Sequence, residues 1–267
     1  SSDLMIVIWV VGIVVLFSII TGREIGYFLT AMGALSAVLL LIFKDTILGF
    51  VASIQIAAND LVRIGDWVTM EKYGADGDVV EINLSTVKVQ NFDKTITTIP
   101  TYNLISDSFK NWRGMAESGG RRIKRSILIQ TQSIRFLEDA DLTNLQRIER
   151  IADFLKERKA EIDAANAGVD KSLAINGRNL TNLGLYRKYI ENYLEKHPKI
   201  NSDLTIMCRQ LPTTSYGSTP LEIYAFSSDK VWKNYEHITA DIFDHLLAAV
   251  SYFDLRCFEL DRSVTKS

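Results

Sequence analysis

Three side chains near the C-terminal end have the spacing of a metal site. His237, Asp241 and His245 recur every four residues, which places them on one face of the helix predicted over residues 231–250. Imidazole and carboxylate groups are common zinc ligands. No fourth ligand is in view, and a polar helix face in water accounts for the same pattern. We therefore expect no bound metal.

Known catalytic motifs are missing from the sequence. It has no G-x-x-x-x-G-K-[ST] phosphate loop, no G-x-S-x-G nucleophile turn, no G-x-G-x-x-G dinucleotide loop and no cysteine pair at metal spacing. We therefore expect no enzymatic activity and no cofactor. Cys208 and Cys257 lie in apolar runs, which favours buried, reduced thiols and a reducing compartment.

A basic cluster, residues 121–125, precedes a predicted strand, and Tyr224 and Phe226 lie two apart on another strand. This combination occurs in RNA-binding sheets, but their glycine–aromatic strand pattern is missing. Phospholipid head groups or permeating ions are alternative partners of the cluster. The 267 residues have a net charge of -2, which gives no indication of a nucleic-acid partner, and we expect none.

Two apolar runs open the chain. Residues 4–20 and residues 26–43 each have about the length that crosses a hydrocarbon core of roughly 30 Å, and only Arg23 and Glu24 interrupt them with charge. We expect a membrane hairpin over residues 1–43. The chain begins Ser1-Ser2-Asp3 without Met, so we also expect a trimmed N-terminus with further membrane helices missing.

The second run is rich in small residues, which let helix backbones approach closely. At 100° per residue, four side chains fall within about 40° of one line, and three others form a neighbouring stripe. The first stripe is predicted to line a pore and the second to pack against an identical helix. Helix packing of any other kind remains an alternative for both. The pore stripe is Thr30, Ala34, Ala37 and Leu41, and the packing stripe is Gly33, Ser36 and Leu40.

Residues 44–59 predict a short helix that lies along the membrane surface. Lys44 and Asp45 end the second apolar run, and Gly49 is a candidate kink, so these three residues are the candidate hinge. Lys44 and Arg63 follow the run, whereas the break before it has a balanced charge. Residues 44–267 are therefore expected in the cytoplasm.

From residue 60 the apolar pattern changes to a period of two, which predicts a small antiparallel β barrel of the Sm-like or SH3-like kind over residues 60–116. The predicted strands are 66–70, 78–82, 86–90 and 95–98.

Residues 117–267 predict a third unit in the order β-α-β-β-α-β, a ferredoxin-like α/β sandwich. Residues 160–200 interrupt this order, and we expect them to be an insertion on the outside that is dispensable for a pore. The predicted strands are 123–131, 204–211, 221–226 and 255–260, and the helices are 141–158 and 231–250. The fold class is thus a membrane α-helical hairpin plus a cytoplasmic α+β part.

This order of elements resembles the small-conductance mechanosensitive channel (MscS-like) family over nearly the whole chain. The matching motif residues are Arg63-Ile64-Gly65-Asp66-Trp67-Val68, Gly77 with Val79 and Ile82, Thr86-Val87-Lys88, Asp93, Ile96 through Ile99-Pro100, and Leu104-Ile105.

The resemblance implies a homoheptamer in a bacterial inner membrane, whose pore opens under membrane tension to pass ions and small solutes during hypoosmotic stress. The two leucine rings that seal the family's pore fall on Ala37 and Leu41, and its helix-breaking glycine falls on Asp45. Only Leu41 keeps a full-sized apolar seal. The family's Asn after Ile-Pro is Thr101 here. A membrane-anchored scaffold or ligand-binding protein without conduction is the competing hypothesis.

Overall fold

The computed structural model describes residues 2–22 and 24–260. The chain divides into two compact units, Ser1–Arg113 and Gly114–Ser267, close to the boundary predicted at residue 117. Arg23, in the break between the two apolar runs, and residues 261–267, at the end of the predicted third unit, lie outside the described residues.

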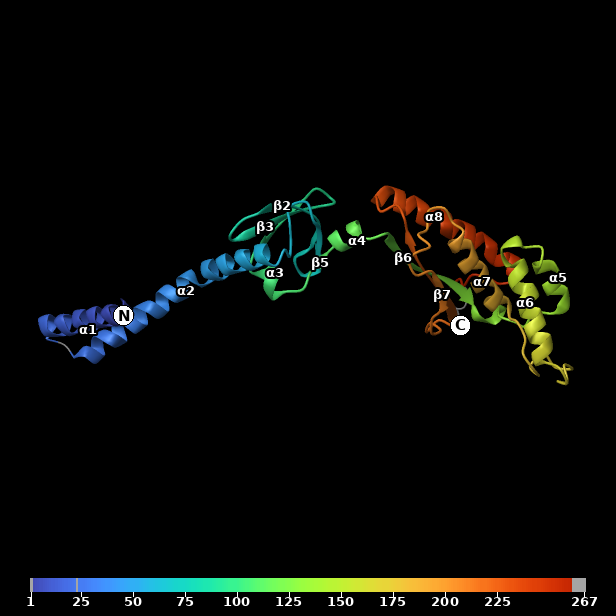
Figure 1. The fold of residues 1–267 in the computed structure, drawn as a ribbon, viewed down its shortest axis with the longest axis horizontal. Coiled ribbons are helices and arrows are strands. Elements are labelled where there is room, and N and C mark those ends of the chain that lie inside the picture. Colours follow the sequence, from blue (N-terminus) through green and yellow to red (C-terminus); the bar gives the residue numbers. More distant parts are fainter. Residues whose placement is uncertain (1, 23, 261–267) are drawn as a thin grey trace, which may run out of the picture. The chain divides into compact units, whose positions relative to one another are not determined.

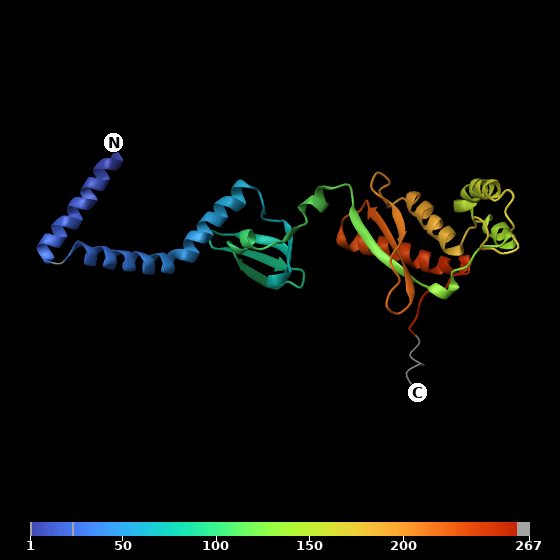
Figure 2. The same ribbon diagram turned by 90° about the horizontal axis from the view of Figure 1, so that it is seen from below.

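The segment predicted to be a membrane hairpin consists of two helices, α1 (Ser2–Thr21) and α2 (Ile25–Ala58), as Figure 1 shows. The rings of Phe17 and Phe28 meet between them with centroids 4.8 Å apart. The separate helix predicted over residues 44–59 is wrong, because α2 continues without interruption for 34 residues. No proline occurs in this stretch, and a single internal glycine costs only about 1 kcal/mol, so helix hydrogen bonding persists. The ribbon of α2 curves along its length (Figure 2).

The β domain of the first unit is one antiparallel sheet in the order β4-β3-β2-β1-β5. The four predicted strands are confirmed with small shifts of their ends, whereas β5 was not predicted. Its strands are β1 (Trp67–Met70), β2 (Ala75–Ile82), β3 (Thr86–Asn91), β4 (Ile96–Pro100) and β5 (Lys110–Asn111), and its short helices are η1 (Glu71–Tyr73) and α3 (Asn103–Ser106). The short helix α4 (Arg113–Glu117) begins at the last residue of the first unit and continues into the second.

Alternation along β2 explains why this sheet has one buried face. Ala75, Gly77 and Val79 are buried, and the aspartates between them are exposed. A side chain at Gly77 would place its Cβ only 2.0 Å from the Gln90 carbonyl oxygen on β3, so the close approach of the two strands requires glycine. The buried face packs on Ile56 from α2, which joins the membrane helix to the domain core.

The second unit is a three-stranded antiparallel sheet, in the order β6-β8-β7, with helices packed on one face. Ile123, Ile127 and Ile129 of β6 point into the core beneath these helices. The elements are β6 (Arg121–Gln130), η2 (Thr131–Ser133), α5 (Asp139–Leu145), α6 (Glu149–Ala165), α7 (Asn182–Glu195), β7 (Met207–Gln210), β8 (Ser218–Ser227), α8 (Trp232–Ala249) and η3 (Val250–Phe253).

The last strand predicted, residues 255–260, is wrong as a full strand. The segment lies along β6 but forms a single bridge, between Ile129 and Cys257. The Gln130 amide donates to the Arg256 carbonyl at 2.8 Å, and the Phe258 amide donates to the Leu128 carbonyl at 2.8 Å.

The helical layer also differs from the prediction. The helix expected over 141–158 is two helices, α5 and α6, and the expected insertion contains α7, which is a core helix. Its side chains Leu185, Tyr186 and Ile190 are fully buried in the main cluster of the unit. The Tyr186 hydroxyl donates to the Leu246 carbonyl of α8 at 2.6 Å. The prediction that residues 160–200 decorate the outside is therefore wrong, and α5–α6 form the outer layer.

We expect replacement of residues 162–199 by a short Gly/Ser bridge to unfold the second unit. The deletion removes α7, and truncating even one buried side chain of this size costs about 2–5 kcal/mol. Far-ultraviolet circular dichroism and resistance to protease would measure the loss. As a control, replacing the exposed loop 170–175 by two glycines should leave the unit folded. A folded unit after the larger deletion would contradict this assignment of α7.

Candidate functional site: the second membrane helix and its anchor

Two helices among the described residues are long and apolar enough to cross a membrane, α1 and α2. Within α2, residues 25–43 precede the charged pair Lys44 and Asp45 and rise roughly 28 Å at ~1.5 Å per residue. This length matches a hydrocarbon core of roughly 30 Å. A segment of this length would therefore end at the charged pair, and the last turns of α2 extend beyond it.

All four residues of the predicted pore stripe lie on α2 and are exposed in the single chain. Leu41 is 74% exposed. The Thr30 hydroxyl donates to the Gly26 carbonyl at 2.8 Å, so its polar group is satisfied within the helix. The stripe therefore offers an apolar surface, and its role in a pore stays a prediction.

The residues of the packing stripe are also exposed in the single chain. A Cβ atom built on Gly33 would meet no atom within 4 Å, and Leu40 is 68% exposed. Ser36 is also exposed. Apolar and small side chains on a membrane helix are available here to a neighbouring helix, which is what the predicted role requires.

The hinge residues divide into two groups. Lys44 and Asp45 are exposed within the continuous helix. Gly49 is buried, and a Cβ there would lie 3.2 Å from the Leu84 carbonyl oxygen in the turn between β2 and β3. Gly49 therefore allows α2 to approach the β domain closely, and its role as a hinge stays a prediction.

The C-terminal turns of α2 have two distinct faces. Gly49, Ala52 and Ile56 are buried against the β domain. Apolar side chains on the opposite side remain exposed, namely Ile47, Phe50, Val51 and Ile54. A helix end that is apolar on both faces suits a position between the folded domain and the membrane interface.

A buried carboxylate fastens the end of α2 to the rest of the β domain. Asp66, 9% exposed, accepts a hydrogen bond from the Arg63 amide at 2.8 Å and another from the Asn111 side-chain amide at 2.8 Å. The Arg113 guanidinium donates to both Asp66 oxygens. Arg113 also pairs at 2.9 Å with Asp60, which lies just beyond the Asn59 cap of α2.

This network shifts the pKa values of its members. Burial opposes the charged carboxylate, but the hydrogen bonds from Arg113, Arg63 and Asn111 outweigh it and lower the pKa of Asp66 to about 2. The same hydrogen bond raises the pKa of Arg113 above its ordinary value. Both groups therefore stay charged throughout the physiological range.

Aromatic stacking beside the network was not predicted. The rings of Trp67 and Trp112 stack with centroids 4.5 Å apart. The Trp112 indole N–H donates to the Thr69 hydroxyl at 2.8 Å, and that hydroxyl donates to Asp76. The polar and aromatic residues at 66–67 and 111–113 were visible in the sequence, but nothing in its periodicity indicated that they meet.

The three residues at metal-site spacing, His237, Asp241 and His245, are not joined by a further ligand among the described residues. In the described part of the chain, no three His, Cys, Asp or Glu side chains are placed to share a metal ion. The His245 Nε2 atom lies 2.6 Å from the Tyr189 hydroxyl, and its ring stacks on Tyr193 at 4.3 Å. Burial, and then the nearby Arg150, lower the pKa of His245. His237 and Asp241 are exposed on α8.

The basic cluster is largely occupied by neighbouring side chains. Arg121 lies over the Tyr235 ring and Arg125 over the Phe243 ring, at 4.3 and 4.7 Å from their centroids. Arg122 lies 5.8 Å from the Tyr224 ring centroid, and Tyr224 meets Phe226 edge to face. Lys124 lies 3.8 Å from the buried Glu222 carboxylate.

Neither predicted thiol is part of a disulfide. Cys208 and Cys257 are free. Burial raises the pKa of the Cys208 thiol to about 12, which makes it an unreactive core side chain. Cys257 is only half-buried, in the segment that lies along β6.

Comparison with known proteins identifies the β domain. Residues 45–114 match the family model for the mechanosensitive ion channel β-domain. The small-conductance mechanosensitive channel MscMJ of Methanocaldococcus jannaschii is 28% identical over 148 residues, which cover 54% of this chain and 38% of that protein. An uncharacterized MscS family protein of Helicobacter pylori is 21% identical over 250 residues, 92% of this chain and 37% of that protein. The chain thus spans about four-tenths of the length of these relatives.

Solved structures share the fold. The cryo-EM structure of Arabidopsis thaliana MSL1 superposes with a TM-score of 0.61 at 12% identity and covers 97% of this chain and 75% of that one. The closed-state crystal structure of Helicobacter pylori MscS gives 0.56 at 13% identity and covers 100% of this chain and 83% of that one. These matches show a shared fold, and the family model and the relatives show that the chain is similar in sequence to MscS-like channels.

We expect Asp66→Asn to lower the free energy of unfolding of the first unit by about 2–4 kcal/mol at neutral pH, because it leaves Arg113 without its buried partner. A carboxylate whose pKa is depressed from 3.8 to about 2 stabilises the fold fully above pH ~4 and loses that contribution as pH falls toward 2. The difference between variant and wild type should therefore shrink across this window.

Tryptophan fluorescence during thermal or denaturant unfolding would report on this change, because Trp67 and Trp112 stack beside the network. Asp78→Asn is the matched control, since Asp78 is exposed on β2 and should respond little. Equal stability of Asp66→Asn and wild type at neutral pH would show that the network does not hold the domain together.

Proposed function

We propose that the chain is one subunit of a mechanosensitive ion channel, which opens under membrane tension and passes ions and small solutes during hypoosmotic stress. One observation supports this most directly: a single helix, α2, carries an apolar stripe through a membrane-length segment and then packs into a domain that matches the channel β-domain. Force on the membrane portion of such a helix reaches the β domain without an intervening loop.

The pore would form from several copies of α2. Thr30, Ala34 and Ala37 present little bulk toward the axis, and Leu41 supplies a full-sized apolar ring near the cytoplasmic end of the membrane segment. A ring of this kind excludes water when it is narrow, so ions meet a dehydration barrier. Tension favours the state of larger membrane area, in which the helices tilt and separate. No ligand or cofactor is needed for that step.

The assembly we propose is a homoheptamer in a bacterial inner membrane, with residues 44–267 in the cytoplasm and lipid around α1 and α2. The packing stripe on α2 supports a neighbouring copy. Within the family, we propose a closer relation to the enterobacterial miniconductance mechanosensitive channel YbdG, because the stretch from Phe43 to Trp112 resembles it.

The finer fold assignment is also part of this proposal. The five-stranded sheet is interpreted as an Sm-like barrel. The order β6-β8-β7, with the bridge from Cys257 on the free edge of β6, is what a ferredoxin-like sheet with a weak fourth strand would give.

We expect Leu41→Ser to lower the barrier to wetting and to produce channels that leak or open at lower tension. Patch-clamp recording of the purified protein in liposomes under suction would measure the threshold. Leu39→Ser is the control, because Leu39 lies on another side of α2. An unchanged threshold in Leu41→Ser, together with a clear shift in Leu39→Ser, would overturn the pore assignment.

A second substitution tests assembly. We expect Gly33→Leu to disrupt the oligomer or to bias gating, because the added bulk would separate neighbouring α2 helices. Within one chain neither Gly33 nor Gly12 of α1 has an atom within 4 Å of a built Cβ, so Gly12→Leu is a matched control. The mass of the particle in detergent measures assembly. A wild-type particle that is folded and monomeric would exclude the ring.

A further inference from the structure

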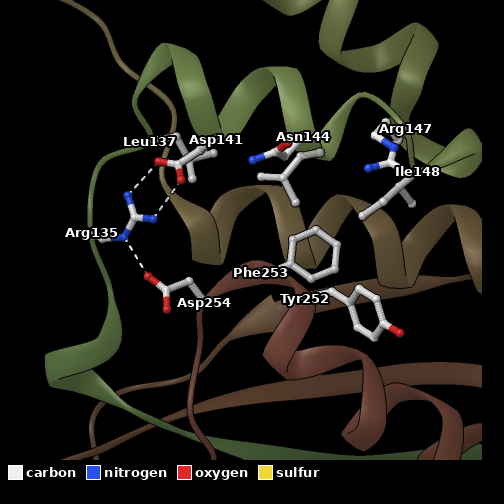
Figure 3. Close-up of a pocket in the computed structure, with 10 residues that line it drawn as sticks. Arg135, Leu137, Asp141, Asn144, Arg147, Ile148, Tyr252, Phe253 and Asp254 are labelled. Carbon is white, nitrogen blue, oxygen red and sulfur yellow. Dashed lines mark hydrogen bonds and ion pairs between the residues drawn. The ribbon is translucent and has the colours of Figure 1, made fainter.

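The second unit has an open cavity where its outer helices meet its core. The cavity has a volume of about 470 Å³ and lies between the α5–α6 turn and η3 (Figure 3). A neighbouring hollow of about 360 Å³ shares Ile148, Tyr252 and Phe253 with it and adds the apolar surface of Ala248 and Ala249. Volumes of this size suit a small organic ligand.

One wall of the cavity is fixed by an ion-pair network. The Arg135 guanidinium donates two hydrogen bonds to Asp141, at 2.6 and 2.9 Å, and a third to Asp254 at 2.9 Å. The Asp254 backbone has a φ of 53°, the left-handed turn that ends η3. The network therefore holds the turn that carries Tyr252 and Phe253, and its three charges are already engaged with one another.

The side of the cavity formed by α5 and the turn after it also offers polar groups that are not engaged. Arg147 and Asn144 lie on the α5 side of the cavity, across from the rings of Phe253 and Tyr252 (Figure 3). Among the described residues, neither the Arg147 guanidinium nor the Asn144 side-chain amide has an ion-pair or hydrogen-bond partner. A guanidinium presents a planar fork of donors that fits the oxygens of a phosphate.

The floor of the cavity is aromatic. Phe253 is 2% exposed and packs on Tyr186 and Tyr189, so its ring is rigid. Tyr252 is 75% exposed at the rim, so its ring face is available to a ligand. Aromatic faces stack nucleobases regardless of base identity.

We propose that this cavity binds a nucleoside monophosphate, with the phosphate at Arg147 and Asn144 and the base against the exposed ring of Tyr252. The free cation and the free amide face this ring across one hollow, so a ligand with an anionic group at one end and a flat ring at the other meets both. Such a site goes beyond the proposed channel activity and does not rest on it, because all its residues belong to the second unit.

Equilibrium dialysis of the purified full-length chain in detergent against adenosine 5′-monophosphate and guanosine 5′-monophosphate tests this proposal. We expect saturable binding of both below about 1 mM, an affinity that a small site of this kind supplies. Adenosine, which lacks the phosphate, and ribose 5-phosphate, which lacks the base, should each bind at least about tenfold more weakly, because each engages only one wall.

Matched variants locate the site. Arg147→Gln should weaken nucleotide binding about tenfold and leave adenosine binding unchanged, because it removes only the charge. Tyr252→Ala should weaken the binding of both ligands. The Tyr252 side chain is 75% exposed, so we expect the variant to fold. Two variants outside the cavity are the controls and should bind as wild type does. Arg158→Gln changes an arginine of α6 that pairs with Glu161, and Tyr216→Ala removes a ring that is 71% exposed.

Absence of saturable binding of either nucleotide by a folded wild-type chain would overturn the proposal. So would binding that Arg147→Gln and Tyr252→Ala leave unchanged, because the ligand would then occupy another part of the chain.

Discussion

The Asp66 carboxylate is the interaction on which the first unit depends. It is a buried charge, and a buried charge is tolerated only when hydrogen bonds and an opposite charge compensate it. Its partners come from two segments far apart in sequence, Arg63 shortly after α2 and Asn111 with Arg113 at the end of the sheet. The compensation therefore fixes the end of α2, the start of β1 and the exit of the chain at one point.

Close packing reinforces this point of attachment. Gly49, Ala52 and Ile56 give α2 a narrow buried face, and the backbone of the β2–β3 turn lies against Gly49. Because α2 is continuous, a displacement of its membrane segment is resisted at both the packed face and the carboxylate. We predict that any bending of α2 occurs between these contacts and its N-terminal apolar segment, where Lys44 and Asp45 are exposed. This physical constraint favours the charged pair over Gly49 as the place where α2 yields.

Hydrophobic periodicity predicted the features that depend on residues close together in the chain. Period-two runs such as Val87 and Val89 predicted the strands, and the uncharged runs predicted the two long apolar helices. The ion pair between Asp66 and Arg113 joins residues 47 apart, and no periodicity records such a contact. The position of α7 in the core was not predicted, because the loop before it is rich in Asn and Gly, a composition typical of a surface insertion. The last predicted strand does not form in full, because its pairing with β6 is limited to a single bridge.

The corrected position of α7 changes how the second unit is to be understood. The sheet, α7 and α8 share one core, and α5–α6 add a further layer through Ile151 and Leu155. Layers meet along surfaces that side chains do not fill completely, and the cavity beside Arg147 lies at such a junction. Leu145 and Phe253 in its lining belong to the core, whereas Arg147 and Tyr252 are exposed at its rim. The exposed side chains at this rim can therefore change at little cost to the core, which makes the junction suited to acquiring a specific ligand.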